Sequence, residues 1–337
     1  MSDTDPFSAL FQALAHGHDM PGRSLFINAV PGAGLDALSR HSVLVQPLQP
    51  YADMLTAQGW QVVPNIPAQD HFDHVLLLVS KNHDETRFAL ARGFQQLAAG
   101  GVMVVAGAND AGGKRIEKDF AALDLTPVSF SKHKSRVVQS RKDSDAMPGV
   151  LQEWIARGDW QPILQGRFDS RPGLFSWDRA DRGSMLLAET LPPELSGRGA
   201  DFGCGYGYLS ASALSACAGI EHITAFDSDH RAVEACARNT KFAQGRIDCV
   251  WSDLTHKPDL QNLDFIVMNP PFHEGVTTQN QLGITFIRNA AACLKHGGKL
   301  FMVANNHLPY EDMLKALFKD VQELDKDKGF KVIRAKK

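Results

Sequence analysis

The chain has 337 residues and a formal net charge of −3; 44% of its residues are apolar and 22% are charged. This composition is typical of globular proteins, and the length predicts two domains because most domains hold about 100–200 residues. The negative net charge provides no global field that would attract nucleic acid, although a local basic patch can suffice for binding.

The sequence also argues against several other classes of protein. The N-terminal stretch MSDTDPFSALFQALAHG begins with acidic residues and lacks the apolar core of a signal peptide. No segment approaches the ~18 uninterrupted apolar residues of a membrane span. The five cysteines form no CxxC pair and are odd in number, which disfavours a disulfide framework or a zinc site. We therefore expect a cytoplasmic protein with reduced thiols, no membrane contact and no metal.

In chain order, the N-terminal half contains four stretches with strand-like apolar patterns. They are LFINAVPGAG (25–34), FDHVLLLVSKN (72–82), FQQLAAGGVMVVAGAN (94–109) and KSRVVQSRK (134–142). The segment that follows, 143–183, is polar with scattered glycine and proline. We expect residues 146–170 to be a linker that leads into the N-terminal lip of a second domain.

The C-terminal half alternates strand and helix patterns. Helices are expected between most of the strands, one of them starting at Ser228 or Asp229 and one closed by Gly297 and Gly298. Alternation of this kind, with continuous apolar strands, predicts a parallel sheet covered on both faces. The expected strands are residues 197–204, 222–227, 247–253, 263–269, 299–305 and 329–337.

The two halves repeat each other. Asp73 corresponds to Asp264 and the pair Gly100-Gly101 to Gly297-Gly298, at offsets close to 190 residues, with a smaller offset for the first strand. We therefore predict an α/β protein with two tandem Rossmann-like domains, each a mostly parallel, doubly wound sheet. The expected boundaries are 1–145 for a degenerate first copy and 171–337 for the second. The first copy has only PGAG where the second has three alternating glycines, and it lacks the double proline of the second.

The first candidate motif is DFGCGYG, residues 201–207. Glycines at alternate positions between a strand and a helix form a turn at which a ligand can approach the backbone closely. The dinucleotide pattern GxGxxG needs glycine at 208, where this chain has Tyr208. The acidic residue before the turn would repel a diphosphate but could lie near an ammonium group. The motif therefore favours a ligand with an amino-acid tail.

Acids follow the next two strands as well. Asp227 lies about 20 residues beyond Gly207, where a carboxylate can accept hydrogen bonds from both ribose hydroxyls. Asp229 is expected to cap the following helix. Asp253, after the third strand, can accept a hydrogen bond from an adenine amino group. In this order, the acids predict a nucleoside pocket.

The second motif is NPPF, residues 269–272, at the end of a buried strand. Both prolines have a fixed φ and no N–H, and Asn269 is restricted to extended geometry, so the loop is stiff. It holds one amide beside one aromatic ring.

Together the two motifs resemble those of class I S-adenosylmethionine-dependent methyltransferases, in which an Asn-Pro-Pro-aromatic loop marks methylation of a planar nitrogen. By that resemblance, the Asn269 side-chain oxygen and the Pro270 carbonyl accept hydrogen bonds from the NH₂ group and aim it at the methyl carbon. Phe272 stacks on the base, and His273 and Glu274 shape the loop. The catalytic residues are then expected to be Asn269, Pro270, Pro271 and Phe272.

Over nearly the whole chain, and most strongly from Pro172 to Ala335, the sequence resembles the small-subunit ribosomal RNA methyltransferase C family. The resemblance rests on a degenerate copy before an active one, NPPFHEG, GG.L..VAN..LPY and a closing FKV.RA. It implies guanine-N2 methylation of 16S ribosomal RNA in the small ribosomal subunit by a monomer, with S-adenosylhomocysteine as product. It places Phe175, Asp181, Gly183 and Ser184, within PGLFSWDRADRGSMLL, near the cofactor or the base. The cofactor residues are expected to be Asp201, Gly203, Cys204, Gly205, Gly207, Asp227, Ser228, Asp253 and Asn269.

RNA contacts are expected from aromatic and basic side chains. The run SKHKSRVVQSRK, with Lys142 at its end, is either a phosphate-binding patch or a charged edge strand. The expected substrate residues are Phe175, Phe272, His273, Lys132, Lys134 and Arg136.

Three alternatives remain open from the sequence. The same loop serves adenine-N6 and protein-glutamine methyltransferases, and a non-catalytic RNA-binding assembly factor could keep the fold. A nicotinamide dehydrogenase is disfavoured by Tyr208 and by the NPPF loop.

Overall fold

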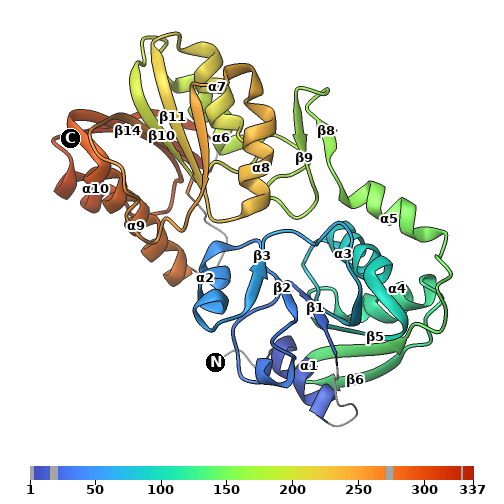
Figure 1. The fold of residues 1–337 in the computed structure, drawn as a ribbon. Coiled ribbons are helices and arrows are strands. Elements are labelled where there is room, and N and C mark those ends of the chain that lie inside the picture. The colour runs from blue at the N-terminus through green and yellow to red at the C-terminus, as the bar shows by residue number, and fades with distance from the viewer. Residues whose placement is uncertain (1–3, 16–21, 271–275, 328) are drawn as a thin grey trace. The chain divides into compact units, whose positions relative to one another are not determined.

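The computed structural model describes residues 4–15, 22–270, 276–327 and 329–337 (Figure 1). The chain divides into two compact units. Unit 1 comprises Met1–Gln161 with Arg171–Gly173, and unit 2 comprises Pro162–Ser170 with Leu174–Lys337.

Unit 1 is built on a seven-stranded sheet in the order β3-β2-β1-β4-β5-β7-β6. Strands β1 to β5 pair in parallel, and β7 and β6 are antiparallel. Apolar side chains of α1 and α2 cover one face, and those of α3, α4 and α5 cover the other. The elements are α1 (Pro6–Ala15), β1 (Ser24–Ile27), η1 (Leu35–Ala37), β2 (Val43–Val45), α2 (Gln49–Ala57), β3 (Gln61–Val63), β4 (Phe72–Leu78), α3 (His83–Gln96), β5 (Leu97–Ala108), η2 (Gly113–Arg115), α4 (Ile116–Ala122), β6 (Val128–Lys132), β7 (Ser135–Arg141) and α5 (Val150–Gly158).

Unit 2 repeats this topology, with strand order β12-β11-β10-β13-β14-β16-β15 and the last two strands antiparallel. Helices α9 and α10 pack on one face, and α6, α7 and α8 on the other (Figure 1). Its elements are β8 (Gln161–Ile163), β9 (Phe168–Ser170), α6 (Arg182–Thr190), β10 (Gly197–Phe202), α7 (Tyr208–Ala216), β11 (Ile220–Asp227), α8 (His230–Asn239), η3 (Lys241–Ala243), β12 (Ile247–Trp251), β13 (Leu263–Met268), α9 (Val276–Cys293), β14 (Leu294–Asn305), α10 (Glu311–Leu317), β15 (Asp320–Asp327) and β16 (Phe330–Lys336).

The two units repeat one another down to single hydrogen bonds. Asp73 accepts the Arg23 N–H at 2.8 Å, and Asp264 accepts the Arg198 N–H at 2.7 Å. The Lys142 ammonium donates to the Leu97 carbonyl at 2.7 Å, as that of Lys337 does to Leu294. Two tandem, mostly parallel, doubly wound sheets are thus confirmed.

Some elements differ from the expected ones. The segment expected as a linker holds α5, β8 and β9. Helix α9 ends at Cys293, and the chain passes directly into β14, so that the Gly297-Gly298 pair lies within a strand rather than at a helix end. Strands β6 and β15 were not anticipated, because each is an edge strand in which no side chain is fully buried.

Candidate active site

The glycine turn connects β10 to α7. Gly203, Gly205 and Gly207 have φ angles of 83°, 54° and 89°, a region that side chains other than glycine rarely adopt. A Cβ on Gly205 would meet nothing within 4 Å, and one on Gly203 only atoms at 3.9 Å, so this part of the backbone is open to a ligand. A Cβ on Gly207 would lie 2.9 Å from Cα of Cys236, so this third glycine allows α7 and α8 to pack closely.

Asp227 supports the turn from the end of β11. Its Oδ2 accepts the Gly205 N–H at 2.9 Å, and its Oδ1 accepts the Asp229 N–H at 2.9 Å. Burial, with a contribution from the neighbouring Asp229 charge, raises the pKa of Asp227 to about 6. Asp229 caps α8 by accepting the Arg231 N–H at 3.0 Å, as expected. Ser228 lies between the two acids, and its carbonyl accepts the Trp251 indole N–H.

Asp201 lies beneath the turn and does not line the pocket described below. It is fully buried, and its Oδ2 accepts the Ser210 hydroxyl at 2.7 Å. Its Oδ1 has no hydrogen-bond partner within the described residues. Burial is the main reason that the pKa of Asp201 is raised, to about 7.

Asp253 follows β12 at a half-buried position, also away from the pocket lining. Its two carboxylate oxygens accept the Thr255 N–H at 2.8 Å and the Thr255 hydroxyl at 2.6 Å. These bonds fix the direction of the carboxylate.

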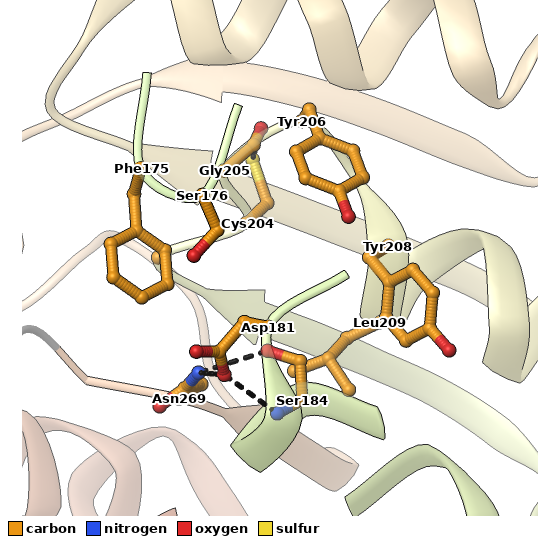
Figure 2. Close-up of a pocket in the computed structure, with 11 residues that line it drawn as sticks. Phe175, Ser176, Asp181, Ser184, Cys204, Gly205, Tyr206, Tyr208, Leu209 and Asn269 are labelled. Carbon is orange, nitrogen blue, oxygen red and sulfur yellow. Dashed lines mark hydrogen bonds between the residues drawn. The ribbon is translucent and has the colours of Figure 1, made fainter. Parts of the chain in front are cut away.

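Asn269 follows β13 and is held by the start of α6 (Figure 2). Its Nδ2 donates to Asp181 Oδ2 at 2.8 Å and to Ser184 Oγ at 2.9 Å. Asp181 Oδ2 also accepts the Ser184 N–H at 2.8 Å and so caps α6. Because both amide hydrogens of Asn269 face acceptors, its Oδ1 is the atom left for a ligand.

Hydrogen bonds join β9 and the segment before α6 to the glycine turn. Asn239 Nδ2 donates to the carbonyls of Asp169 and Tyr206, at 2.8 and 2.7 Å, and Asn239 Oδ1 accepts the Asp169 N–H at 2.7 Å. Tyr206 donates its hydroxyl to the Arg179 carbonyl at 3.1 Å. The Phe168 ring lies 5.6 Å from that of Tyr206, edge-on.

These groups enclose a pocket at the carboxyl ends of β10 and β13 (Figure 2). Of the residues that the resemblance placed here, Phe175, Asp181 and Ser184 line the pocket, and Gly183 packs beside Asp181. Sequence reasoning missed Ser176, Tyr206, Tyr208, Leu209 and Asn239, although the aromatic residues in GYGY were a visible signal. The pocket is lined by Phe175, Ser176, Asp181, Ser184, Gly203, Cys204, Gly205, Tyr206, Tyr208, Leu209 and Asn269.

Of the remaining residues of the NPPF motif, only Pro270 lies within the described part of the chain. Pro270 is buried next to Asn269. Pro271, Phe272 and His273 lie outside the described residues, so their predicted roles stay predictions.

The basic run lies in unit 1, around the β6–β7 turn. Lys132 and Lys134 are exposed, and Lys134 is in the left-handed turn with φ 51°. Arg136 is half-buried and forms an ion pair with Glu117. The expectation that Lys142 belongs to a surface patch is wrong, because its side chain is 2% exposed and caps backbone carbonyls.

Within residues 4–15, 22–270, 276–327 and 329–337, no helix combines the length and the apolar character that a membrane span requires. No group of three or more His, Cys, Asp or Glu side chains within those ranges is arranged to hold a metal ion.

Comparison with known proteins identifies the family. Residues 165–334 match the family model of the methyltransferase small domain, and residues 22–157 match that of its N-terminal domain. A ribosomal RNA small subunit methyltransferase C from Shewanella pealeana is 29% identical over 92% of this chain and 89% of its own length. One from Sodalis glossinidius is 32% identical over 78% and 73%.

A solved structure supports the same family assignment. A T. thermophilus 16S rRNA N2 methyltransferase, in complex with AdoMet and guanosine, superposes with a TM-score of 0.81 at 27% identity, over 99% of this chain and 92% of that one. The domain models, the relatives and the shared tandem fold show that this chain belongs to the ribosomal RNA small subunit methyltransferase C family, as its motifs predicted.

Proposed function

We propose that this protein transfers a methyl group from S-adenosylmethionine to the exocyclic N2 amine of a guanine in 16S ribosomal RNA, within the small ribosomal subunit. The observation that carries the proposal is the fixed amide of Asn269, whose nitrogen is bonded to Asp181 and Ser184 beside the open glycine turn. The T. thermophilus relative is a 16S rRNA N2 methyltransferase, and the other relatives are ribosomal RNA small subunit methyltransferases C, which supports the same target.

The residues present fit S-adenosylmethionine. The exposed backbone at Gly203 and Gly205 leaves room for the cofactor's amino-acid tail, and the carboxylates of Asp227 and Asp253 suit ribose hydroxyls and an adenine amine. The unpartnered Oδ1 of Asp201 offers an acceptor beneath the turn. We propose that the cofactor is bound by Asp201, Gly203, Cys204, Gly205, Gly207, Asp227, Ser228, Asp253 and Asn269.

An electrophilic methyl group on a sulfonium sulfur is the chemistry that the cofactor supplies. The guanine N2 lone pair is delocalised into the ring, so the amine is a weak nucleophile. Asn269 Oδ1 and the Pro270 carbonyl accept its two hydrogens, which turns the lone pair toward the methyl carbon and stabilises the positive charge that develops on nitrogen. The N–CH₃ bond forms as the S–CH₃ bond breaks. S-adenosylhomocysteine leaves, and the acidified nitrogen releases a proton to solvent.

The base itself needs a stacking surface. Phe175 lines the pocket and its side chain is 48% exposed, which suits a ring that receives a base extruded from RNA. Phe272 and His273 remain predicted contacts of the base.

We propose for unit 1 a role in recruiting or orienting the RNA, with Lys132, Lys134 and Arg136 as candidate phosphate contacts. Lys132 and Lys134 are exposed, whereas Arg136 is half-buried. We also propose that the protein acts as a monomer in the cytoplasm.

The proposal is tested by transfer of tritiated methyl groups. The protein is offered unmodified small subunits, naked 16S RNA, duplex DNA and a release factor in parallel, and cofactor binding is measured by titration calorimetry. We expect label in the RNA of the small subunit. Label in DNA or protein alone would overturn the target, and absence of cofactor binding would indicate an assembly factor without catalytic activity.

A further inference from the structure

The carboxylate of Asp181 uses only one of its two oxygens inside the protein. Oδ2 accepts the Ser184 N–H and the Asn269 amide, each at 2.8 Å. Within the described residues, no hydrogen bond is recorded to Oδ1. Figure 2 shows this second oxygen pointing away from Ser184, on the side of the Phe175 ring, and the side-chain oxygen of Asn269 also pointing away from Ser184.

The pocket therefore presents two adjacent acceptors. Asn269 cannot rotate its amide by half a turn, because its oxygen would then face the Asp181 carboxylate, which has no proton to donate when ionised. The neighbouring Oδ1 of Asp181 carries negative charge. A ligand edge with two neighbouring N–H donors fits this pair, and an edge with a donor beside a lone pair does not.

Guanine and adenine differ at this edge. Guanine presents the N1–H donor next to the N2 amine, whereas adenine presents the N1 lone pair next to its N6 amine. A base that donates its reacting amine to Asn269 Oδ1 and enters with its Watson–Crick edge toward Asp181 places N1 against Asp181 Oδ1. Guanine then donates a charge-assisted hydrogen bond, and adenine places a lone pair against a carboxylate.

We infer that Asp181 selects guanine over adenine by accepting the N1–H of the target base, while its other oxygen orients Asn269. This inference rests on the proposed function, and it assigns the choice of base to a residue outside the NPPF motif. It also explains why the acid that caps α6 lines the pocket, since a cap alone could be made by serine or threonine.

The test exchanges an acceptor for a donor. In Asp181→Asn, the amide oxygen is required at the Oδ2 position to accept from Ser184 and Asn269, so the NH₂ group occupies the Oδ1 position and faces the base. Asparagine caps helices as well as aspartate does. The probes are guanosine, adenosine and the fluorescent 2-aminopurine riboside, which keeps the C2 amine of guanine but has a lone pair at N1. Dissociation constants are measured with S-adenosylhomocysteine present.

We expect the wild-type protein to bind guanosine about 10- to 100-fold more tightly than 2-aminopurine riboside, and Asp181→Asn to reverse the order. The matched control is Asp178→Asn, the same exchange at an exposed acid of the same segment that pairs with Arg179 and does not line the pocket. It should keep the wild-type order.

The outcomes separate the inference from the function on which it rests. Equal wild-type binding of guanosine and 2-aminopurine riboside overturns the inference alone, even if the variant does not fold. The inference is also overturned if Asp181→Asn weakens the binding of guanosine and of 2-aminopurine riboside by the same factor. Preference of the wild-type protein for adenosine, or binding of none of the three, overturns the proposed guanine target and the inference with it.

Discussion

Asn269 has one defined orientation because Asp181 and Ser184 accept both hydrogens of its amide. In Asn269→Ala, the acceptor for the reacting amine is lost while the glycine turn is untouched. We expect the rate constant for transfer to fall by about 100-fold or more and the affinity for S-adenosylhomocysteine to stay within about threefold. Single-turnover transfer and calorimetry check the two values.

Asn289→Ala is the matched control for this variant. In the wild-type protein, Asn289 Nδ2 donates a hydrogen bond within unit 2 to the Leu254 carbonyl at 2.9 Å. Asn289 does not line the pocket. Loss of cofactor binding together with transfer in Asn269→Ala, but not in Asn289→Ala, would mean that Asn269 supports the pocket rather than the reaction.

The buried acid Asp201 makes stability depend on pH. Burial raises its pKa to about 7, so the native state binds this proton more tightly than the unfolded chain does. The free energy of unfolding therefore falls as pH rises from about 4 to about 7. In Asp201→Asn this loss is absent. From pH 5 to pH 8, we expect the stability of the variant relative to wild type to rise by on the order of a few kcal/mol in urea unfolding. A difference that does not change with pH would contradict the buried ionisation.

At the scale of elements, Asn239 joins the end of α8 to β9 and to the glycine turn. Asn239→Ala removes three hydrogen bonds and loosens Tyr206, which lines the pocket. We expect a loss of about 1–3 kcal/mol in unfolding free energy and weaker binding of S-adenosylhomocysteine. Asn289→Ala again serves as control and should lose stability without losing affinity. Unchanged affinity in Asn239→Ala would show that the segment before α6 does not position the turn.

The sequence predicted those elements whose burial leaves a pattern. Strands such as β13 and β4 are covered on both faces and are continuous apolar runs, and the glycines mark the turn after β10. Strand β6, by contrast, is exposed at every position, and its backbone pairing with β7 is a contact that local sequence does not specify. Edge strands are defined by their neighbours, which local pattern does not show.

The same distinction holds within the site. The turn glycines were predictable because their positive φ angles favour glycine, and Asn269 was predictable because it belongs to the NPPF motif. The hydrogen bond from Asn269 to Asp181 spans 88 positions of the chain, and the bonds from Asn239 to Asp169 span 70. Residues such as Asn239 have no local signal, since the fold alone brings them to the turn.

At the scale of the whole molecule, strand register shows where unit 1 differs from unit 2. Ile27 pairs with Val45 and Leu77 as Phe202 pairs with Phe226 and Met268. The next residues along these strands are Gln46 where unit 2 has Asp227, and Leu78 where it has Asn269. A further difference is that the rings of Phe7 and Phe11 pack directly on Gly32 and Gly34 in unit 1, whereas Gly203 and Gly205 of unit 2 are open.

This comparison predicts one cofactor per chain. Gln46 donates to the Ala29 carbonyl at 2.6 Å and offers no carboxylate for a ribose. Calorimetric titration of the full chain with S-adenosylhomocysteine should give a stoichiometry of one, and Asp227→Ala should abolish that binding. A second site that survives Asp227→Ala would contradict the loss of function in unit 1.

Methylation of guanine N2 by unit 2 is checked by identifying the modified nucleoside. Unmodified small subunits are incubated with the protein and tritiated S-adenosylmethionine, the RNA is digested to nucleosides, and the label is resolved by chromatography and mass spectrometry. We expect label in N2-methylguanosine with wild-type protein and none with Asn269→Ala. Label in N6-methyladenosine, or equal labelling by the variant, would show that unit 2 does not methylate guanine N2 through Asn269.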